Sequence, residues 1–237
     1  ASSCRALIAQ KIAELPKEYL SQLPKNGAII EEYFEGKDFC SPSVDVLVQD
    51  TRDIRALTAY DMTMGGEQNL SFRGIFGPFQ WEQDLKGMSV QTARALAHKG
   101  IRDHLAVDFV VFRDPQGVQQ AYAVEVNMRK SGGTPPYRIL SYLTDDDNLA
   151  GKSYYSNEKV PLPAFREISP KMWQKHGEQI ERDFFEWLSE QSFTFNPERK
   201  EGCVVHFHCF PNSSVGVTCM GESVEEAKQF LEKFRAA

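Results

Sequence analysis

Two neighbouring apolar segments most constrain how this chain can fold. The first runs from Leu105 to Phe112 and the second from Gln119 to Met128, and the turn sequence Asp114-Pro115-Gln116-Gly117 lies between them. Both are rich in valine and aromatic residues, which favour strands, and a short connection with proline and glycine favours a hairpin. We therefore expect an antiparallel pair of strands, each of which carries a carboxylate.

Asp108 and Glu125 are these carboxylates, and an unpartnered carboxylate in an apolar strand is costly. Side chains alternate along a strand, so Glu125 and Asn127 share a face, and the hairpin can bring Asp108 beside them. Two carboxylates and an amide oxygen suit Mg²⁺, which keeps part of its water and binds substrate phosphates. Arg129 continues the same face and could clamp a transferring phosphoryl group. The competing interpretation is a structural ion pair between Glu125 and Arg129 at the strand end.

The segment after Arg129 favours the magnesium interpretation. It reads Lys-Ser-Gly-Gly-Thr-Pro-Pro over residues 130–136. A glycine-rich turn that opens a helix exposes backbone amides to an anion, although the same sequence is also an ordinary turn. Together with the two strands, it predicts a phosphate-binding region.

Apolar spacing and turn residues predict the other elements. Helices are expected over Arg5 to Leu23 as one or two pieces, from Ser89 to His98, over about Lys171 to Gln191, and from Ser223 onward. Strands are expected at 28–30, Val44 to Val48, Arg55 to Tyr60, Cys203 to Cys209 and Val215 to Met220. Residues 62–80 are expected to form a loop, and residues 145–165 a connection to a tail module.

Composition excludes several classes of protein. A net charge of −6 provides no clustered positive charge for nucleic acid, and no run of 18 apolar residues is present to cross a bilayer. The five cysteines are odd in number and contain no C-x-x-C pair, so neither a disulfide framework nor a zinc site is indicated. We expect a soluble, cytoplasmic protein that binds neither nucleic acid nor membrane.

Two further sets of residues have competing interpretations. Arg73 lies where a substrate carboxylate could be received, but solvated surface arginines are more common. His206 and His208 alternate on a tail strand and could resemble a metal pair. A structural role for the two histidines is preferred, because no third ligand is evident.

The strand "AVDFVVF" followed by "YAVEVNMRKSGGTPP" resembles the ATP-grasp superfamily, whose last strands supply an acidic residue and then an E-x-N motif, with E-x-N-x-R in several members. The similarity is closest to peptide ligases of the pheganomycin type and related uncharacterised ATP-grasp proteins. The resemblance implies an α+β ATP-grasp core, with a mainly antiparallel sheet flanked by helices and a small α/β tail module. It implies ATP and Mg²⁺ as cofactors, with metal on Asp108, Glu125 and Asn127, and catalytic roles for Arg129 and Arg73.

The earlier sequence "IIEEYFEGKDF" resembles the linker strand of these enzymes, which reads the adenine edge. If the roles in these enzymes apply to the matching residues here, Glu31, Glu32 and Phe34 would line the adenine site, and Asp38 would hold the ribose. The tail "GCVVHFHCFPNSSVGVTCMGESVEEAKQF" resembles the small module that follows the ligase core. Residues 1–150 are accordingly expected to be the C-terminal portion of the catalytic domain, and residues 151–237 the tail module packed on it.

The resemblance implies an ATP-dependent carboxylate–amine ligase that acts through an acyl phosphate on small-molecule substrates. The chain departs from the family in its N-terminal part, where only Arg5 to Ile29 precedes the linker strand. Lys11 and Lys17, on an expected helix, are poor substitutes for the usual strand lysine. We therefore expect a fragment that needs an N-terminal region or a partner chain. The alternative is a nucleotide-binding or regulatory module that does not turn over.

Overall fold

The structure is a computed structural model that describes residues 2–27, 32, 34, 36–65, 71–161, 170–209 and 214–237. The chain divides into two compact units, Ala1–Glu35 and Gly36–Ala237. The first unit contains helices α1 (Ser2–Ala13) and α2 (Lys17–Asn26). Pro16, with φ −54° and ψ 145°, separates them, as its missing amide and fixed φ predict. The expected strand at 28–30 lies outside the described residues.

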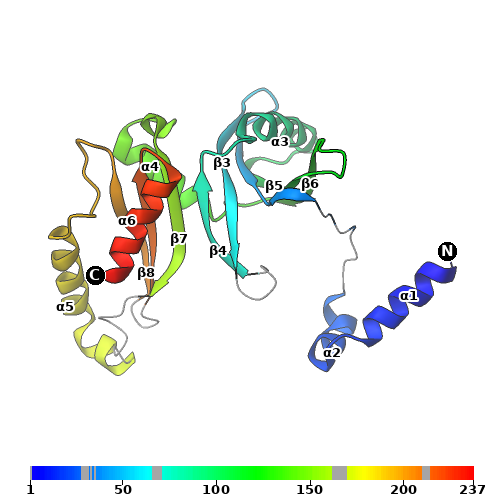
Figure 1. Cartoon of the computed structure of the whole chain (residues 1–237), viewed down its shortest axis with the longest axis horizontal. Coiled ribbons are helices and arrows are strands. Elements are labelled where there is room, and N and C mark those ends of the chain that lie inside the picture. The colour runs from blue at the N-terminus through cyan, green and yellow to red at the C-terminus, as the bar shows by residue number, and fades with distance from the viewer. Residues whose placement is uncertain are drawn as a thin grey trace. The chain divides into compact units, whose positions relative to one another are not determined.

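The second unit is built on one sheet of nine described strands (Figure 1). They are β1 (Lys37–Cys40), β2 (Ser43–Val48), β3 (Ile54–Gly65), β4 (Ser71–Gly77), β5 (Asp103–Arg113), β6 (Gln119–Asn127), β7 (Ser153–Pro161), β8 (Gly202–Cys209) and β9 (Ser214–Gly221). The order is β1-β5-β2-β3-β4-β7-β9-β8, and β6 pairs with β5. Every pairing of these strands is antiparallel, which confirms the expected sheet type.

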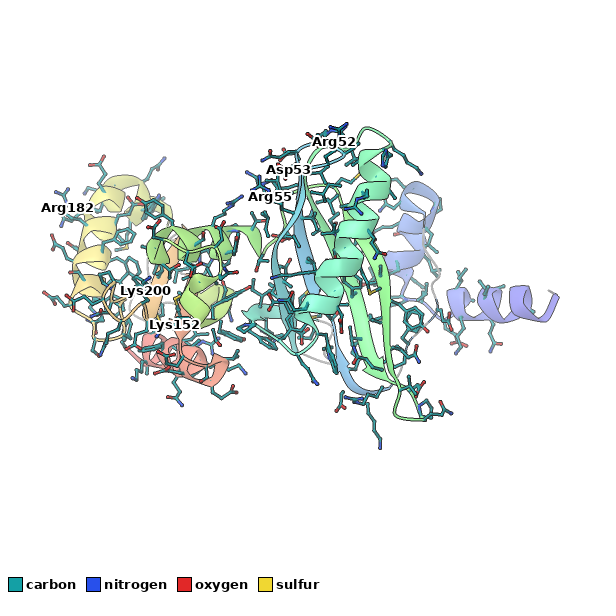
Figure 2. The ribbon with its side chains drawn as sticks, turned by 90° about the horizontal axis from the view of Figure 1, so that it is seen from above. Arg52, Asp53, Arg55, Lys152, Arg182 and Lys200 are labelled. Carbon is teal, nitrogen blue, oxygen red and sulfur yellow. The ribbon has the colours of Figure 1, made fainter. Side chains whose placement is uncertain are left out.

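Four α-helices flank this sheet: α3 (Glu82–Ala97), α4 (Thr134–Thr144), α5 (Pro170–Ser189) and α6 (Val224–Ala236), and a 3₁₀ turn spans Leu149–Gly151. Figure 2 shows α3 lying along the strands of its part of the sheet. Its buried residues pack with Val44, Val46, Val107 and Phe109, which alternate along β2 and β5. The residues between these valines and phenylalanine therefore point to the opposite face. That face carries the polar groups described below.

The C-terminal end of α4 is tied to the chain before β8. Lys200, labelled in Figure 2, donates from Nζ to the carbonyl oxygen of Thr144 at 2.8 Å. A cation at the last carbonyls of a helix satisfies a free acceptor and complements the helix dipole. Asp145 ends the helix in the left-handed conformation, with φ 52°. This end of α4 is therefore fixed independently of its start.

Most expected elements are present, and the expected hairpin of β5 and β6 is confirmed with Asp114 capping its turn. The last helix begins after Ser223, whose hydroxyl accepts from the amide of Glu226 at 3.1 Å, as its sequence predicts. None of the helices in the described part of the chain combines the length and apolar character needed to cross a bilayer. The division at residue 150 stays a prediction.

The expected loop over residues 62–80 is wrong. β3 continues to Gly65, and β4 pairs with it over Ser71–Gly77. Gly74 lies within β4, where a Cβ would be 2.2 Å from the carbonyl oxygen of Ser156 on β7. Glycine is required there for close approach of two strands.

Two further boundaries differ from expectation. Within the expected connection 145–165, β7 pairs with both β4 and β9, because neighbouring strands satisfy a backbone that composition alone assigned to a loop. Ser89 does not cap α3, which begins seven residues earlier at Glu82, and it is buried in mid-helix. Acidic Glu82 and Asp84 favour that earlier start.

Two adjacent phenylalanines on α5 allow a test of how this helix packs against the hydrophobic core that includes residues of α6. Phe184 is fully buried, whereas Phe185 is 44% exposed. We expect Phe184→Ala to lower the free energy of unfolding by about 3–5 kcal/mol through lost burial and a residual cavity. Phe185→Ala, the matched control, should lower it by about 1 kcal/mol or less. Urea unfolding measures both, and equal effects would contradict the assigned packing.

Candidate nucleotide and metal site

The candidate site lies on the face of the sheet opposite α3. Asp108 on β5 is directly across from Ser43 on β2 and from Glu125 on β6. Asn127 pairs with Ala106, two residues from Asp108, so Asn127 shares this face. The structure thus brings together the three residues that the sequence predicts as metal ligands.

Asp108 is the centre of this group. Its Oδ1 accepts a hydrogen bond from the Ser43 hydroxyl at 2.6 Å, and its Oδ2 accepts from Nδ2 of Asn127 at 3.0 Å. Glu125 is exposed, whereas Asp108 and Asn127 are partly buried. The site therefore has one carboxylate held by neighbours and one open to solvent.

Burial raises the pKa of Asp108, and the Ser43 hydroxyl lowers it. The charge of Glu125, its hydrogen bond with Asp108, and the more distant charge of Asp45 raise this pKa again. Like charges crowded on a partly buried face oppose ionisation of one another. A cation between them would remove this repulsion.

Arg129 lies at the end of the same strand. Its backbone amide donates to the carbonyl of Asn127 at 2.9 Å, and its Nη2 donates to Oδ1 of Asn127 at 3.3 Å. The guanidinium therefore orients the amide group of a predicted ligand. An amide oxygen has two lone pairs, so one remains available for a cation. The alternative ion pair between Glu125 and Arg129 is not among the contacts of the described residues.

The start of α4 differs from the sequence expectation. The amide of Thr134 donates to the carbonyl of Ser131 at 3.3 Å, and that of Tyr137 to Gly133 at 3.2 Å. Pro135 and Pro136 have no amide hydrogen. The first turn of α4 therefore offers no free amide to a phosphate. Phosphate binding by the glycine-rich turn before the helix stays a prediction.

Sequence reasoning missed Asp45. It lies on β2 between Val44 and Val46, is 1% exposed, and its Oδ2 accepts from the hydroxyl of Thr134 at 2.5 Å. Burial raises its pKa, while hydrogen bonds with Ser131 and Thr134 lower it. The signal that drew attention to Asp108, a carboxylate inside an apolar strand, was equally present at Asp45.

The other predicted site residues lie elsewhere. Arg73 is exposed on β4, which β2 and β3 separate from β5. Asp38 on β1 has φ 53°, and its Oδ2 pairs with Nε of Arg113 at 3.1 Å. Arg113 is five residues along β5 from Asp108, which corresponds to roughly 17 Å of extended strand.

Of the expected adenine-site residues, Glu31 lies outside the described residues. Glu32 is exposed and Phe34 half-buried, and both belong to the first compact unit. Their role at a nucleotide stays a prediction, as does that of Asp38.

His206 is a structural residue in the described part of the tail. Its Nδ1 lies 2.9 Å from the hydroxyl oxygen of Thr218, and that hydroxyl donates its proton to Oγ of Ser156 at 2.9 Å. The ring packs on Gly216, where a Cβ would lie 2.6 Å from Nε2. Among the described residues, no three His, Cys, Asp or Glu side chains gather where they could hold a metal ion, and the side chain of His208 lies outside them.

Comparison with models of protein families identifies the class of this chain. A family model described as IQCH-like, ATP-grasp matches residues 6–148, more than half of the chain. The chain therefore belongs to the IQCH-like ATP-grasp family. Comparison with curated protein sequences finds no significant match.

Solved structures share the fold at low identity. Biotin carboxylase from Campylobacter jejuni has a TM-score of 0.55 at 12% identity, over 93% of this chain and 52% of that one. The biotin carboxylase domain of 2-oxoglutarate carboxylase from Hydrogenobacter thermophilus, solved with MgADP and bicarbonate, has a TM-score of 0.57 at 12% identity, over 97% and 51%. Pyruvate carboxylase from Rhizobium etli has a TM-score of 0.56 at 11% identity, over 90% and 20%. The chain thus spans about half or less of the length of these proteins.

The burial of His206 predicts how stability changes with pH. Burial lowers the pKa of this histidine from 6.5 to about 4. The folded state therefore binds fewer protons than the unfolded state between these values, and His206 contributes stability above pH 6.5 that is lost as pH falls toward 4. The full shift corresponds to roughly 3 kcal/mol. We expect the stability difference between wild type and His206→Gln to shrink by an amount of this order between pH 7.5 and 4. A pH-independent difference in urea unfolding would contradict this.

Proposed function

We propose that this chain forms the carboxylate-activating, metal-binding half of an ATP- and Mg²⁺-dependent ligase that joins a carboxylate to an amine through an acyl phosphate. The observation that supports it is the group of Asp108, Glu125 and Asn127 on one face of the sheet, with Arg129 at the strand end. Membership of an ATP-grasp family supports the proposal that the chain binds ATP.

The donor set fits magnesium. Asp108 and Glu125 supply carboxylate oxygens and Asn127 an amide oxygen, all of which are hard ligands. Burial raises the pKa of Asp108 and the charge of Glu125 raises it further, and a divalent cation would relieve the repulsion between the two carboxylates. Bound magnesium would supply charge neutralisation at the nucleotide phosphates. Asp108, Glu125 and Asn127 are the residues that would hold it.

The surrounding residues have separate tasks in this proposal. The Ser43 hydroxyl fixes the rotamer of Asp108 and favours its ionised form. Arg129 orients Asn127 and presents its guanidinium, a donor suited to phosphoryl oxygens. Arg73, exposed on β4, would receive the carboxylate of a substrate. Most of the catalysis would come from positioning and charge neutralisation.

The reaction that fits best is peptide-type ligation. The E-x-N-x-R-x-G-G-T-like sequence at 125–134 resembles that of the pheganomycin-type enzymes and supports this choice. Glu31, Glu32, Phe34 and Asp38 would serve the adenosine. An N-terminal region or a partner chain would provide the strand lysine and the loop over the phosphates.

A second candidate is a nucleotide-binding or regulatory module without turnover. It would retain the carboxylate–amide face of Asp108, Glu125 and Asn127 without turning over a substrate. Such a module would bind nucleotide with magnesium and release no phosphate in the presence of any carboxylate and amine. Phosphate release by the chain together with its N-terminal region would exclude this candidate.

The metal ligands are tested by calorimetric titration with a non-hydrolysable ATP analogue, first with magnesium and then with EDTA. We expect Glu125→Gln and Asn127→Ala to abolish magnesium-dependent binding while the cooperative unfolding transition is retained. Glu178→Gln, an exposed carboxylate on α5, is the matched control and should bind as wild type. Unchanged affinity in both site variants would remove these residues from the proposed metal site.

A further inference from the structure

The start of α4 already holds an anion from the protein. Thr134 is the first residue of the helix, and its hydroxyl donates to Oδ2 of the buried Asp45 on β2. A carboxylate near a helix N-terminus is stabilised by the helix dipole. The glycine-rich turn before α4 is thus attached to the sheet, and the attachment fixes the position of the residues next to the turn.

The hydroxyl of Thr134 joins Asp45 to this turn. While it donates to Asp45 at 2.5 Å, the same oxygen accepts from the amide of Ser131 at 3.2 Å. A threonine hydroxyl has one proton and two lone pairs, so both bonds form together. The carboxylate on β2 therefore fixes the backbone of the turn through one side chain.

A second attachment comes from β3. Tyr60 donates from its hydroxyl to Oγ of Ser131 at 2.8 Å, and this Oγ accepts from the amide of Gly133 at 3.0 Å. The Tyr60 ring lies so close to Gly133 that a Cβ there would be 2.1 Å from a ring carbon. Position 133 needs glycine because of this close approach and not because of its backbone conformation, since any residue can adopt its φ of −79°. Two strands therefore hold one turn.

The turn begins two residues after Arg129, which contacts Asn127 through both its amide and its guanidinium. Displacing residues 131–133 would move the chain that carries Arg129, and with it the group that orients Asn127. Stability alone does not explain a buried carboxylate at this point, because apolar residues of similar volume often hold a contact without the desolvation penalty. One oxygen of Asp45, Oδ1, is buried without a hydrogen-bond partner.

We propose that Asp45, acting through the hydroxyl of Thr134 and supported by Tyr60, is the positioning residue that holds the Ser131–Gly133 turn and thereby sets Arg129 and Asn127 in the site. This inference rests on the proposed function for its consequence, since the metal and nucleotide are what the positioned residues would bind. The attachment itself is a property of the chain without either group.

The experiment measures hydrogen exchange of peptides covering residues 128–134 and magnesium-dependent affinity for a non-hydrolysable ATP analogue. Thr134→Val removes the hydroxyl at nearly constant volume, and Thr134→Ser restores it. Thr144→Val is the matched control, because Thr144 is a buried threonine of the same helix whose hydroxyl bonds the carbonyl of Leu140. Tyr60→Phe removes the second attachment and keeps the ring.

We expect Thr134→Val to accelerate exchange in the turn and to weaken the nucleotide affinity by about tenfold, as loss of one hydrogen bond to a charged group implies. Thr134→Ser should behave as wild type. Thr144→Val should change neither measurement by more than about twofold, because its bond lies at the other end of α4. Should Thr134→Val fail to fold, Asp45→Asn weakens the same hydrogen bond from the side of β2, and Tyr60→Phe tests the second attachment of the turn.

Two outcomes would overturn the inference. One is unchanged exchange in the turn in both Thr134→Val and Tyr60→Phe. The other is an equal loss of affinity in Thr134→Val and Thr144→Val, which would indicate a general effect of destabilising α4. If the wild-type chain does not bind the nucleotide, the proposed function fails, while accelerated exchange confined to residues 128–134 still supports the attachment.

Discussion

The structure depends on how three carboxylates are accommodated on one face of a sheet. Asp45, Asp108 and Glu125 come from three different strands, and two of them are removed from solvent to a large extent. Burial of a carboxylate is unfavourable unless hydrogen bonds or opposite charge compensate it. Asp45 accepts from the Thr134 hydroxyl and keeps Oδ1 buried without a partner, whereas both oxygens of Asp108 accept hydrogen bonds, from Ser43 and Asn127. Asp108 differs from Asp45 in facing the exposed carboxylate of Glu125, and a cation would act between these two groups.

The same strands make the opposite face rigid. Val44, Val46, Val107 and Phe109 alternate with the polar residues and pack under α3. A shift of one residue in the pairing register of a strand would place its carboxylate in this apolar core. The register is therefore strongly specified. Packing of the apolar side chains under α3 also fixes the positions of the polar side chains, because the same strands carry both sets. A site on strands is held more accurately than a site on loops, and the turn at 131–133 gains comparable order from its attachments to Asp45 and Tyr60.

The chain shares its fold with three carboxylases. Those proteins are about twice as long or longer, and the similarity at 11–12% identity concerns the fold. The family membership rests on residues 6–148, which contain Asp108, Glu125, Asn127 and Arg129. The proposed ligase and the proposed non-catalytic module share this metal face. They differ in whether a covering region completes the site.

The sequence by itself determined the hairpin of β5 and β6, the shared face of Asp108, Glu125 and Asn127, and the mainly antiparallel sheet, because alternation and turn chemistry are local properties. Only the tertiary structure decided that residues 62–80 and 145–165 contribute strands, since their glycines and polar residues are accommodated by partners distant in sequence. It also decided that the hydroxyl of Thr134, at the start of α4, donates to the carboxyl group of Asp45, 89 residues away. No local pattern encodes that contact, because it depends on which strand lies beneath the helix.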